Sequence, residues 1–328
     1  MLKTTTLIGG LFATLLCCAA HLNLPPEQVV VRHEAHDEPK NSIYHWMTTF
    51  SPTQQVLDFV AEHNIERIYM RMFDVDLIYN ENTGESNIEP VATIMFKGEV
   101  PSGVEIVPTT YITYEALTSL RYHEEEYAEL IVERILAMAN YNNCGEIGEV
   151  QFDCDWTENT RKTYFKLLEH ARGLLQEYGI TLSATIRLHQ LDEEAPPVER
   201  GVLMLYNTGN FRDIETENSI LDVSDVKPYL RVKGYPLPLD YAYPTYGWSV
   251  SFYDGEFDSL VAGTEYEPQF SLEHVRHERP SVATILEVKR MTEEALGKPY
   301  QSNILYHLDE SQLKYYSNDE ITEILSRD

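Results

Sequence analysis

Acidic residues gather in one short segment, Asp153-Cys154-Asp155-Trp156-Thr157-Glu158. Asp153 and Asp155 are two residues apart, so in a regular strand their side chains point to the same side. Two carboxylates that share a site repel each other, which favours a proton on one of them near neutral pH. Glycoside hydrolysis needs that division, with one carboxyl as acid and another as base, nucleophile or stabiliser. We therefore predict Asp153, Asp155 and Glu158 as candidate catalytic residues.

Two other interpretations of these carboxylates stay open. Asp153 could pair with a buried arginine such as Arg71 and only stabilise the fold. An Asp-x-Asp segment could also bind a metal, and a metal-dependent hydrolase would then use Asp153, Asp155 and His189. One short acidic motif is weak evidence for a metal, and no Cys/His spacing of the zinc type occurs. We therefore predict neither a metal nor a cofactor.

Polar and aromatic residues also follow other apolar segments of the chain. Aromatic rings suit sugars, because the C–H side of a pyranose is apolar. Trp156, Tyr241, Tyr246 and His307 are expected near the same site. The residues predicted to bind a glycan substrate are Trp46, Arg71, Asp74, Arg187, His189, Tyr206, Asn207, Asp240, Tyr243, Trp248 and Asp309.

Strand and helix signals alternate from residue 41 onward, a pattern typical of parallel β/α units. The helices expected to cover the strands span residues 51–63, 124–139, 161–178, 224–233 and 318–326, with Ser51 as the first cap. The eight expected strands span residues 43–49, 67–73, 104–111, 148–155, 181–189, 201–207, 238–243 and 303–308. This count predicts an α/β fold, a single (β/α)8 TIM barrel over residues 41–328. A doubly wound sheet is the alternative, but no Gly-rich turn follows the first strand to support it.

Two insertions interrupt this alternation, after strands 2 and 7. Residues 74–103 are expected to form a small hairpin, and residues 249–279 a hairpin turned at Asp254-Gly255. Both leave the carboxyl ends of strands, where barrel enzymes have their active sites. The predicted site residues should therefore meet in one bowl at that face.

Two of the strand ends resemble a known family. The segment Phe152–Glu158 resembles the DxDxE motif of family 18 glycoside hydrolases, the chitinases and their endo-glycosidase relatives, and Met204–Asn207 resembles that family's Met-x-Tyr-Asp motif. In the family, the Glu protonates the leaving oxygen, and the Asp two residues earlier orients the N-acetyl group that acts as nucleophile. The resemblance implies that Asp155 orients an acetamide and that Tyr206 contacts it. The chain also resembles exported bacterial barrel proteins with an acidic fourth strand, from which no activity follows.

The chain departs from the family motifs at two positions. The family's catalytic Glu falls at Thr157, with Glu158 one residue later as our substitute acid, and the strand-six Asp is Asn207. The carboxylates favour a glycosidase that acts on an N-acetylated or related glycan. Thr157 favours a non-catalytic, carbohydrate-binding surface lipoprotein that has lost the acid. A cavity that narrows onto Asp155 and Glu158 would support the enzyme, and carboxylates held by arginine would support the binding protein.

The net charge limits the binding partners expected for this protein, and the N-terminal residues indicate its location. The formal net charge is −28, from 25 Lys and Arg against 53 Asp and Glu, which repels nucleic acid. Residues 1–20 have the layout of a secretory signal peptide, and residues 21–40 form a polar tether. Cleavage after Ala20 and lipidation of Cys18 are both open. We expect an exported protein, in the periplasm or cell envelope, that meets a membrane only through such a lipid.

Two cysteines, Cys144 and Cys154, remain after the expected signal peptide. A disulfide between them is open in an oxidising compartment. Cys154 lies in an expected strand, which favours a buried free thiol.

Overall fold

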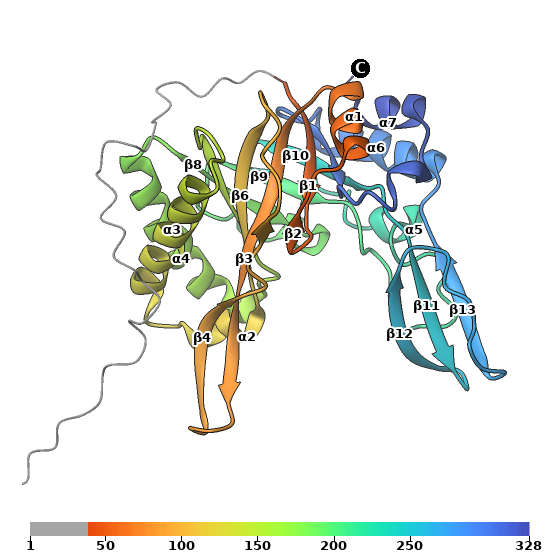
Figure 1. Cartoon of the computed structure of the whole chain (residues 1–328), viewed down its shortest axis with the longest axis horizontal. Coiled ribbons are helices and arrows are strands. Elements are labelled where there is room, and N and C mark those ends of the chain that lie inside the picture. The colour runs from red at the N-terminus through yellow and green to blue at the C-terminus, as the bar shows by residue number, and fades with distance from the viewer. Residues whose placement is uncertain (1–38, 328) are drawn as a thin grey trace, which may run out of the picture. The chain divides into compact units, whose positions relative to one another are not determined.

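The computed structural model describes residues 39–327 (Figure 1). The expected signal peptide, Cys18 and the tether up to residue 38 lie outside this range. Within it, no helix has the length and apolar character needed to cross a membrane. Cys144 and Cys154 are both buried free thiols.

Eight parallel strands close into a barrel. Each strand pairs with its neighbours, and β1 pairs with both β14 and β3, which completes the ring. The barrel strands are β1 (Asn41–His45), β3 (Ile65–Asn80), β6 (Glu105–Ile112), β7 (Glu149–Asp153), β8 (Thr181–Ile186), β9 (Arg200–Met204), β10 (Leu239–Pro244) and β14 (Asn303–Tyr306). The predicted TIM barrel is confirmed, and the doubly wound alternative is wrong because the sheet has no open edge between β14 and β3.

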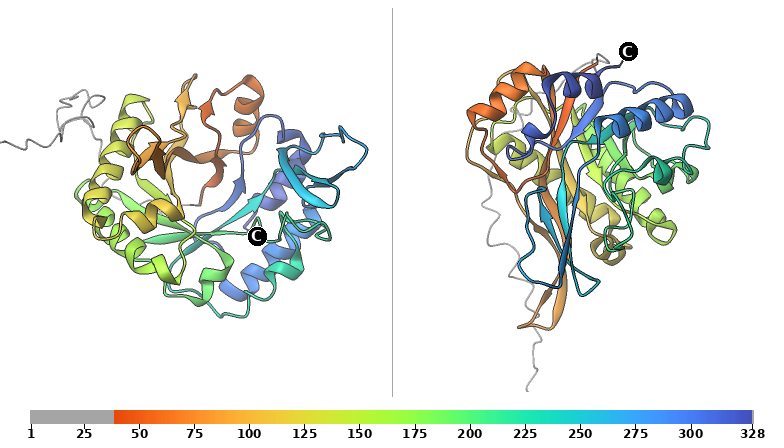
Figure 2. Two further views of the ribbon diagram at one scale, coloured as in Figure 1. Left: turned by 90° about the horizontal axis from the view of Figure 1, so that it is seen from below. Right: turned by 90° about the vertical axis from the view of Figure 1, so that its right-hand side faces the viewer.

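Helices surround the strands on the outside (Figure 2). They are α1 (Gln54–Glu62), α2 (Tyr114–Ser119), α3 (Glu124–Tyr141), α4 (Glu158–Glu177), α5 (Val223–Val226), α6 (Val282–Leu296) and α7 (Asn318–Leu325), with short 3-10 turns η1 (Leu188–Asp192) and η2 (Leu313–Tyr315). The cap of α1 is Thr53, whose hydroxyl accepts from the Val56 amide at 3.4 Å, and not Ser51. The helix expected over 224–233 shortens to one turn, and α6 was not anticipated.

Both insertions form β-structure. β3 continues beyond the barrel and pairs antiparallel with β4 (Glu85–Val91). After β10, the strands β11 (Trp248–Tyr253), β12 (Glu256–Ala262) and β13 (Glu273–Glu278) make a separate sheet, with positive φ angles of 50° and 83° at Asp254 and Gly255. Positive φ at both central residues suits the tight turn between β11 and β12. Two short strands, β2 (Thr49–Phe50) and β5 (Met95–Phe96), also pair. Figure 1 shows both insertions projecting from the same end of the barrel.

Side chains alternate along each strand between two cores. One set packs between the strands and the helices, and the other, with Tyr44, Tyr69, Val107, Val202 and Ile304, fills the barrel interior. Because the strand period is two, a single residue step moves a side chain from one core to the other. This alternation decides which polar residues reach the bowl.

Candidate functional site

A cavity of about 190 Å³ lies at the carboxyl ends of the barrel strands. Its walls come from the ends of β1, β6, β7, β8, β9 and β14, so most of the barrel contributes to it. The lining residues are Trp46, Tyr111, Asp153, Asp155, Arg187, Met204, Tyr206, Asn207 and Tyr306.

Strand alternation explains why these side chains point inward. Tyr306 lies two residues after Ile304, and Met204 two residues after Val202, both of which fill the barrel interior. Asp153 likewise follows Gln151, whose side-chain oxygen accepts from the Tyr44 hydroxyl at 2.7 Å inside the barrel. The cavity is thus the open top of the interior core.

Arg187 lies between the two aspartates of the cavity. Its Nη2 is 3.4 Å from Oδ1 of Asp153, and its Nε donates to Oδ1 of Asp155. Asp153 is buried and also accepts from the Thr185 hydroxyl at 2.5 Å, whereas the Asp155 side chain is 49% exposed. One cation therefore binds both candidate carboxylates, of which Asp155 is the more exposed.

Burial and neighbouring charges have opposite effects on the pKa values of Asp153 and Arg187. Burial raises the pKa of Asp153, and Arg187 only partly offsets it. Burial lowers the pKa of Arg187, but Asp153 and Asp155 more than offset that effect, so its net shift is upward. The guanidinium therefore stays charged, and it satisfies the carboxylates electrostatically.

Two stacked tyrosines, Tyr206 and Tyr306, also line the cavity. The rings of Tyr206 and Tyr306 stack with centroids 4.2 Å apart, and Tyr246 meets both edge-on. The buried Tyr206 hydroxyl has no hydrogen-bond partner, and burial raises the pKa of Tyr206 well above its usual value. Tyr206 thus offers a neutral phenol to a ligand. Asn207 has φ of 55° and accepts from the Tyr246 hydroxyl.

Arg71 and Asp74, which were predicted to bind substrate, lie outside the cavity lining and contact it through Trp46. Arg71 forms an ion pair with Asp74, with Nε donating to Oδ1 at 2.6 Å, and its Nη1 donates to the Trp46 carbonyl at 3.1 Å. Its guanidinium also lies 5.4 Å from the centre of the Trp46 ring. Asp153 does pair with a largely buried arginine, as one interpretation of the sequence held, but that arginine is Arg187 and not Arg71.

Two predicted residues of β10 lie away from the cavity. Asp240 accepts from the amides of Gln301 and Ser302 at 2.6 and 2.8 Å, just before β14 begins, so it lies at the amino-terminal end of the barrel. Tyr243 packs between the strands and the helices. Asp240 faces the barrel interior, but at the end opposite the cavity. Tyr243 is one residue away from an inward-facing position of β10, so its side chain points to the helices. The prediction that they line the bowl is wrong.

Neither Thr157 nor Glu158 lines the cavity. Both are exposed, and Glu158 is the first residue of α4. Thr157 caps that helix, and its amide donates to the Thr160 hydroxyl at 3.0 Å. The helix start turns both side chains outside the lining, so the expected acid Glu158 does not reach the bowl.

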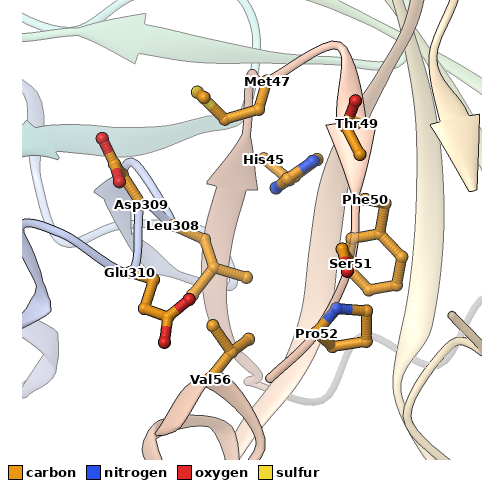
Figure 3. Close-up of a pocket in the computed structure, with 10 residues that line it drawn as sticks. All are labelled: His45, Met47, Thr49, Phe50, Ser51, Pro52, Val56, Leu308, Asp309 and Glu310. Carbon is orange, nitrogen blue, oxygen red and sulfur yellow. The ribbon is translucent and has the colours of Figure 1, made fainter. Parts of the chain in front are cut away.

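Further predicted residues also lie elsewhere. His189 is exposed on η1, and Trp248 donates from Nε1 to Glu278 at 2.9 Å outside the cavity lining. Asp309 lines a separate cavity (Figure 3). Trp156 and Tyr241, expected near the bowl, pack between strands and helices. These residues follow strands in the sequence, just as the residues that line the cavity do. Their position in the chain was therefore not enough to tell the two groups apart.

Three lining residues were not among those predicted from the sequence, namely Tyr111, Met204 and Tyr306. Each lies two residues beyond another inward-facing position, so strict period-two counting from the strand centres would have found them. Within residues 39–327, no three His, Cys, Asp or Glu side chains converge as a metal site. The metal-dependent hydrolase lacks its third ligand, because His189 lies away from Asp153 and Asp155.

Solved structures with this barrel include enzymes that act on glycans. The spore cortex-lytic enzyme SleL of Bacillus megaterium QM B1551 has a TM-score of 0.55 and 11% identity, with 88% of this chain and 73% of that chain covered. A chitinase from Bacteroides thetaiotaomicron has a TM-score of 0.54 and 14% identity, with 88% and 97% covered. The Ostrinia furnacalis Group IV chitinase, in complex with allosamidin, has a TM-score of 0.51 and 13% identity, with 88% and 98% covered.

No protein-family model matches the chain, and no curated protein matches it. The structural likeness is therefore one of fold. At that level it confirms the distant resemblance to chitinase-type barrels, with which this chain shares the TIM-barrel fold.

Proposed function

We propose that this barrel binds a glycan in the cavity without hydrolysing it, and that the glycan carries N-acetylated sugars. The observation that carries the proposal is the Arg187 contact with both Asp153 and Asp155. No third carboxylate lines the cavity. The site therefore offers hydrogen-bonding groups and aromatic faces, but no carboxyl placed to donate a proton.

The lining suits a sugar. Trp46, Tyr111 and Tyr306 present ring surfaces for the apolar face of a pyranose. The unpartnered Tyr206 hydroxyl can donate to a carbonyl or hydroxyl, and the exposed part of Asp155 can accept from hydroxyls or an amide N–H. The lining thus combines aromatic rings with several hydrogen-bonding groups, as recognition of a hydroxyl-rich sugar requires. The chitinase with the same fold that binds allosamidin supports an N-acetylated glycan.

Hydrolysis would need two carboxyl groups in different roles. A general acid must reach the leaving oxygen, and Thr157 stands where the family has its Glu. Glu158 lies outside the cavity lining. Asp153 is buried in the cavity wall, and its Oδ1 accepts hydrogen bonds from Thr185 and Arg187, so this carboxyl is held by the guanidinium.

We propose that the protein acts outside the cytoplasm. Residues 1–20 supply the export signal. A lipid on Cys18 would fix the barrel to a membrane through the tether, and cleavage after Ala20 would release it. Either route suits a protein that captures glycans in the periplasm or cell envelope.

A glycan-array screen of the mature protein, with mass-spectrometric detection of products, tests the proposal. We expect retention of N-acetylated oligosaccharides and no cleavage product. Tyr206→Phe keeps the stacking on Tyr306 but removes the hydroxyl, so it should weaken binding. Tyr253→Phe, on the exposed end of β11, is the matched control and should bind like the wild type. Turnover by the wild type would restore the glycosidase interpretation, and no retention of any glycan would overturn both.

A further inference from the structure

A second cavity of about 210 Å³ lies beside the bowl, on the outer side of the barrel wall. Figure 3 shows side chains from the end of β1, from the segment through β2 and from the loop after β14 around it. The ends of β1 and β14 serve both cavities, because strand alternation turns Trp46 and Tyr306 toward the bowl and His45 and Leu308 toward the outer cavity. The Leu308 amide donates to the Tyr44 carbonyl at 2.7 Å, which holds the two ends together.

His45 is the buried polar group of this cavity. It is 5% exposed, and neither ring nitrogen has a hydrogen-bond partner of good geometry, although the backbone of Thr49 and Leu308 lies close to the ring. The ring meets Phe50 edge-on with centroids 5.2 Å apart, so its orientation is fixed by packing. Burial and the neighbouring His307 lower the pKa of His45 to about 4. At neutral pH the ring is therefore uncharged, with one N–H and one free lone pair.

The rim of the outer cavity is acidic. Asp309 and Glu310 are both in the lining, and none of the ten lining residues is Lys or Arg. The Asp309 carboxylate accepts from the backbone amide and hydroxyl of Ser311 and from the side-chain Nε2 of Gln312 at 2.8 to 3.0 Å. Burial raises the pKa of Asp309, but these hydrogen bonds outweigh it, so the group is ionised at neutral pH. Glu310 is exposed at the mouth.

We infer that the outer cavity binds a short organic ammonium ion. The ammonium has three N–H donors, which match the rim carboxylates and the free lone pair of His45. Phe50, Val56 and Leu308 offer apolar contact to a short carbon chain. The described residues hold no cluster of three metal-binding side chains, and an apolar wall suits an organic cation better than a hydrated metal. The net charge of −28 also raises the local concentration of cations.

Butylammonium and butanol test the inference, because they have similar size and differ in charge. Titration of the whole purified protein would be followed through methyl NMR signals. Butylammonium should shift the signals of Met47, Val56 and Leu308, with a Kd of about millimolar order. Met204, in the bowl, is the internal control and should not shift. Butanol should bind more weakly.

Two variants separate the acidic rim from the imidazole. Glu310→Gln should weaken butylammonium binding about fivefold and leave butanol unchanged. Glu125→Gln, on the exposed first turn of α3, is the matched control. His45→Phe keeps an aromatic ring against Phe50 and should also weaken the amine. Should that variant not fold, Glu310→Lys, on the surface, should abolish amine binding. Equal binding of amine and alcohol, or an unchanged amine affinity in Glu310→Gln and Glu310→Lys, overturns the inference.

Discussion

Arg187 donates from Nη2 to Oδ1 of Asp153 across 3.4 Å, between the ends of β8 and β7. Side-chain exposure is 20% for Arg187 and 2% for Asp153, so water screens this pair poorly. The same guanidinium also binds Asp155. The pair therefore contributes to stability and to the chemical character of the cavity at once.

Removal of the Arg187 charge should destabilise the fold. Arg187→Gln leaves Asp153 buried without its cation, which typically costs about 3 kcal/mol in the free energy of unfolding. Urea denaturation measures it. Arg161→Gln, which breaks the more exposed pair with Glu193, is the control and should cost less than about 1 kcal/mol. An equal effect of the two substitutions would show that Arg187 is not structurally important.

The aromatic rim should determine glycan affinity. Trp46→Ala removes one ring surface of the cavity, and we expect about tenfold weaker binding, equivalent to about 1.4 kcal/mol. Isothermal titration calorimetry with the best glycan from the array gives the value. Tyr253→Ala, on the exposed end of β11, should leave the affinity unchanged. Full binding by Trp46→Ala would place the glycan elsewhere.

Asp155 and Glu158 should respond differently to loss of charge. Asp155→Asn alters a lining residue and its contact with Arg187, so glycan affinity should fall about tenfold. Glu158→Gln alters an exposed residue outside the lining and should remain within about twofold of the wild type. Surface plasmon resonance on one glycan compares them. A large loss in Glu158→Gln alone would return Glu158 to the site.

Acid should destabilise the protein through its buried histidines. Burial is the main cause that lowers the pKa of His45 and of His307 to about 4, whereas an unfolded His has a pKa of about 6.5. The neutral ring is thus favoured in the fold. Its contribution to stability is complete above about pH 6.5 and is lost as the pH falls toward 4.

The His45 part of this loss is roughly 3 kcal/mol at most. Thermal or urea unfolding between pH 7 and about 4 measures it, and His45→Phe should flatten the decline. His189→Phe, at an exposed position on η1, is the control. An unchanged pH profile in His45→Phe would contradict the assignment.

Export should be visible in the N-terminus of the protein isolated from cells. Intact mass and N-terminal sequencing of the cell-envelope fraction should show that about the first twenty residues are removed. A diacylglycerol adduct on Cys18 would select the lipid anchor, and a free N-terminus at His21 would select the soluble form. A full-length cytoplasmic protein would refute export.

The sequence alone determined the order of the eight barrel strands and the barrel fold. Period-two apolar segments that alternate with capped amphipathic segments are local features, and eight of them suit one closed sheet. The sequence also predicted Asp153, Asp155, Arg187 and Tyr206 near the cavity, because the carboxyl ends of parallel strands meet at one face. The sequence did not fix the exact ends of helices, such as the cap of α1 at Thr53 and the length of α5, because helix ends depend on local backbone geometry.

Only the tertiary structure decided which side of the wall each residue faces, and at what height. Asp240 and Asp153 are both strand aspartates, yet the register between β10 and β14 puts Asp240 at the amino-terminal end. A one-residue step likewise separates Tyr243 from the interior. Arg187 rather than Arg71 is the partner of Asp153 because β8 pairs directly with β7, whereas β6 lies between β7 and β3. This order of strands in the sheet is a tertiary feature that no local pattern in the sequence encodes.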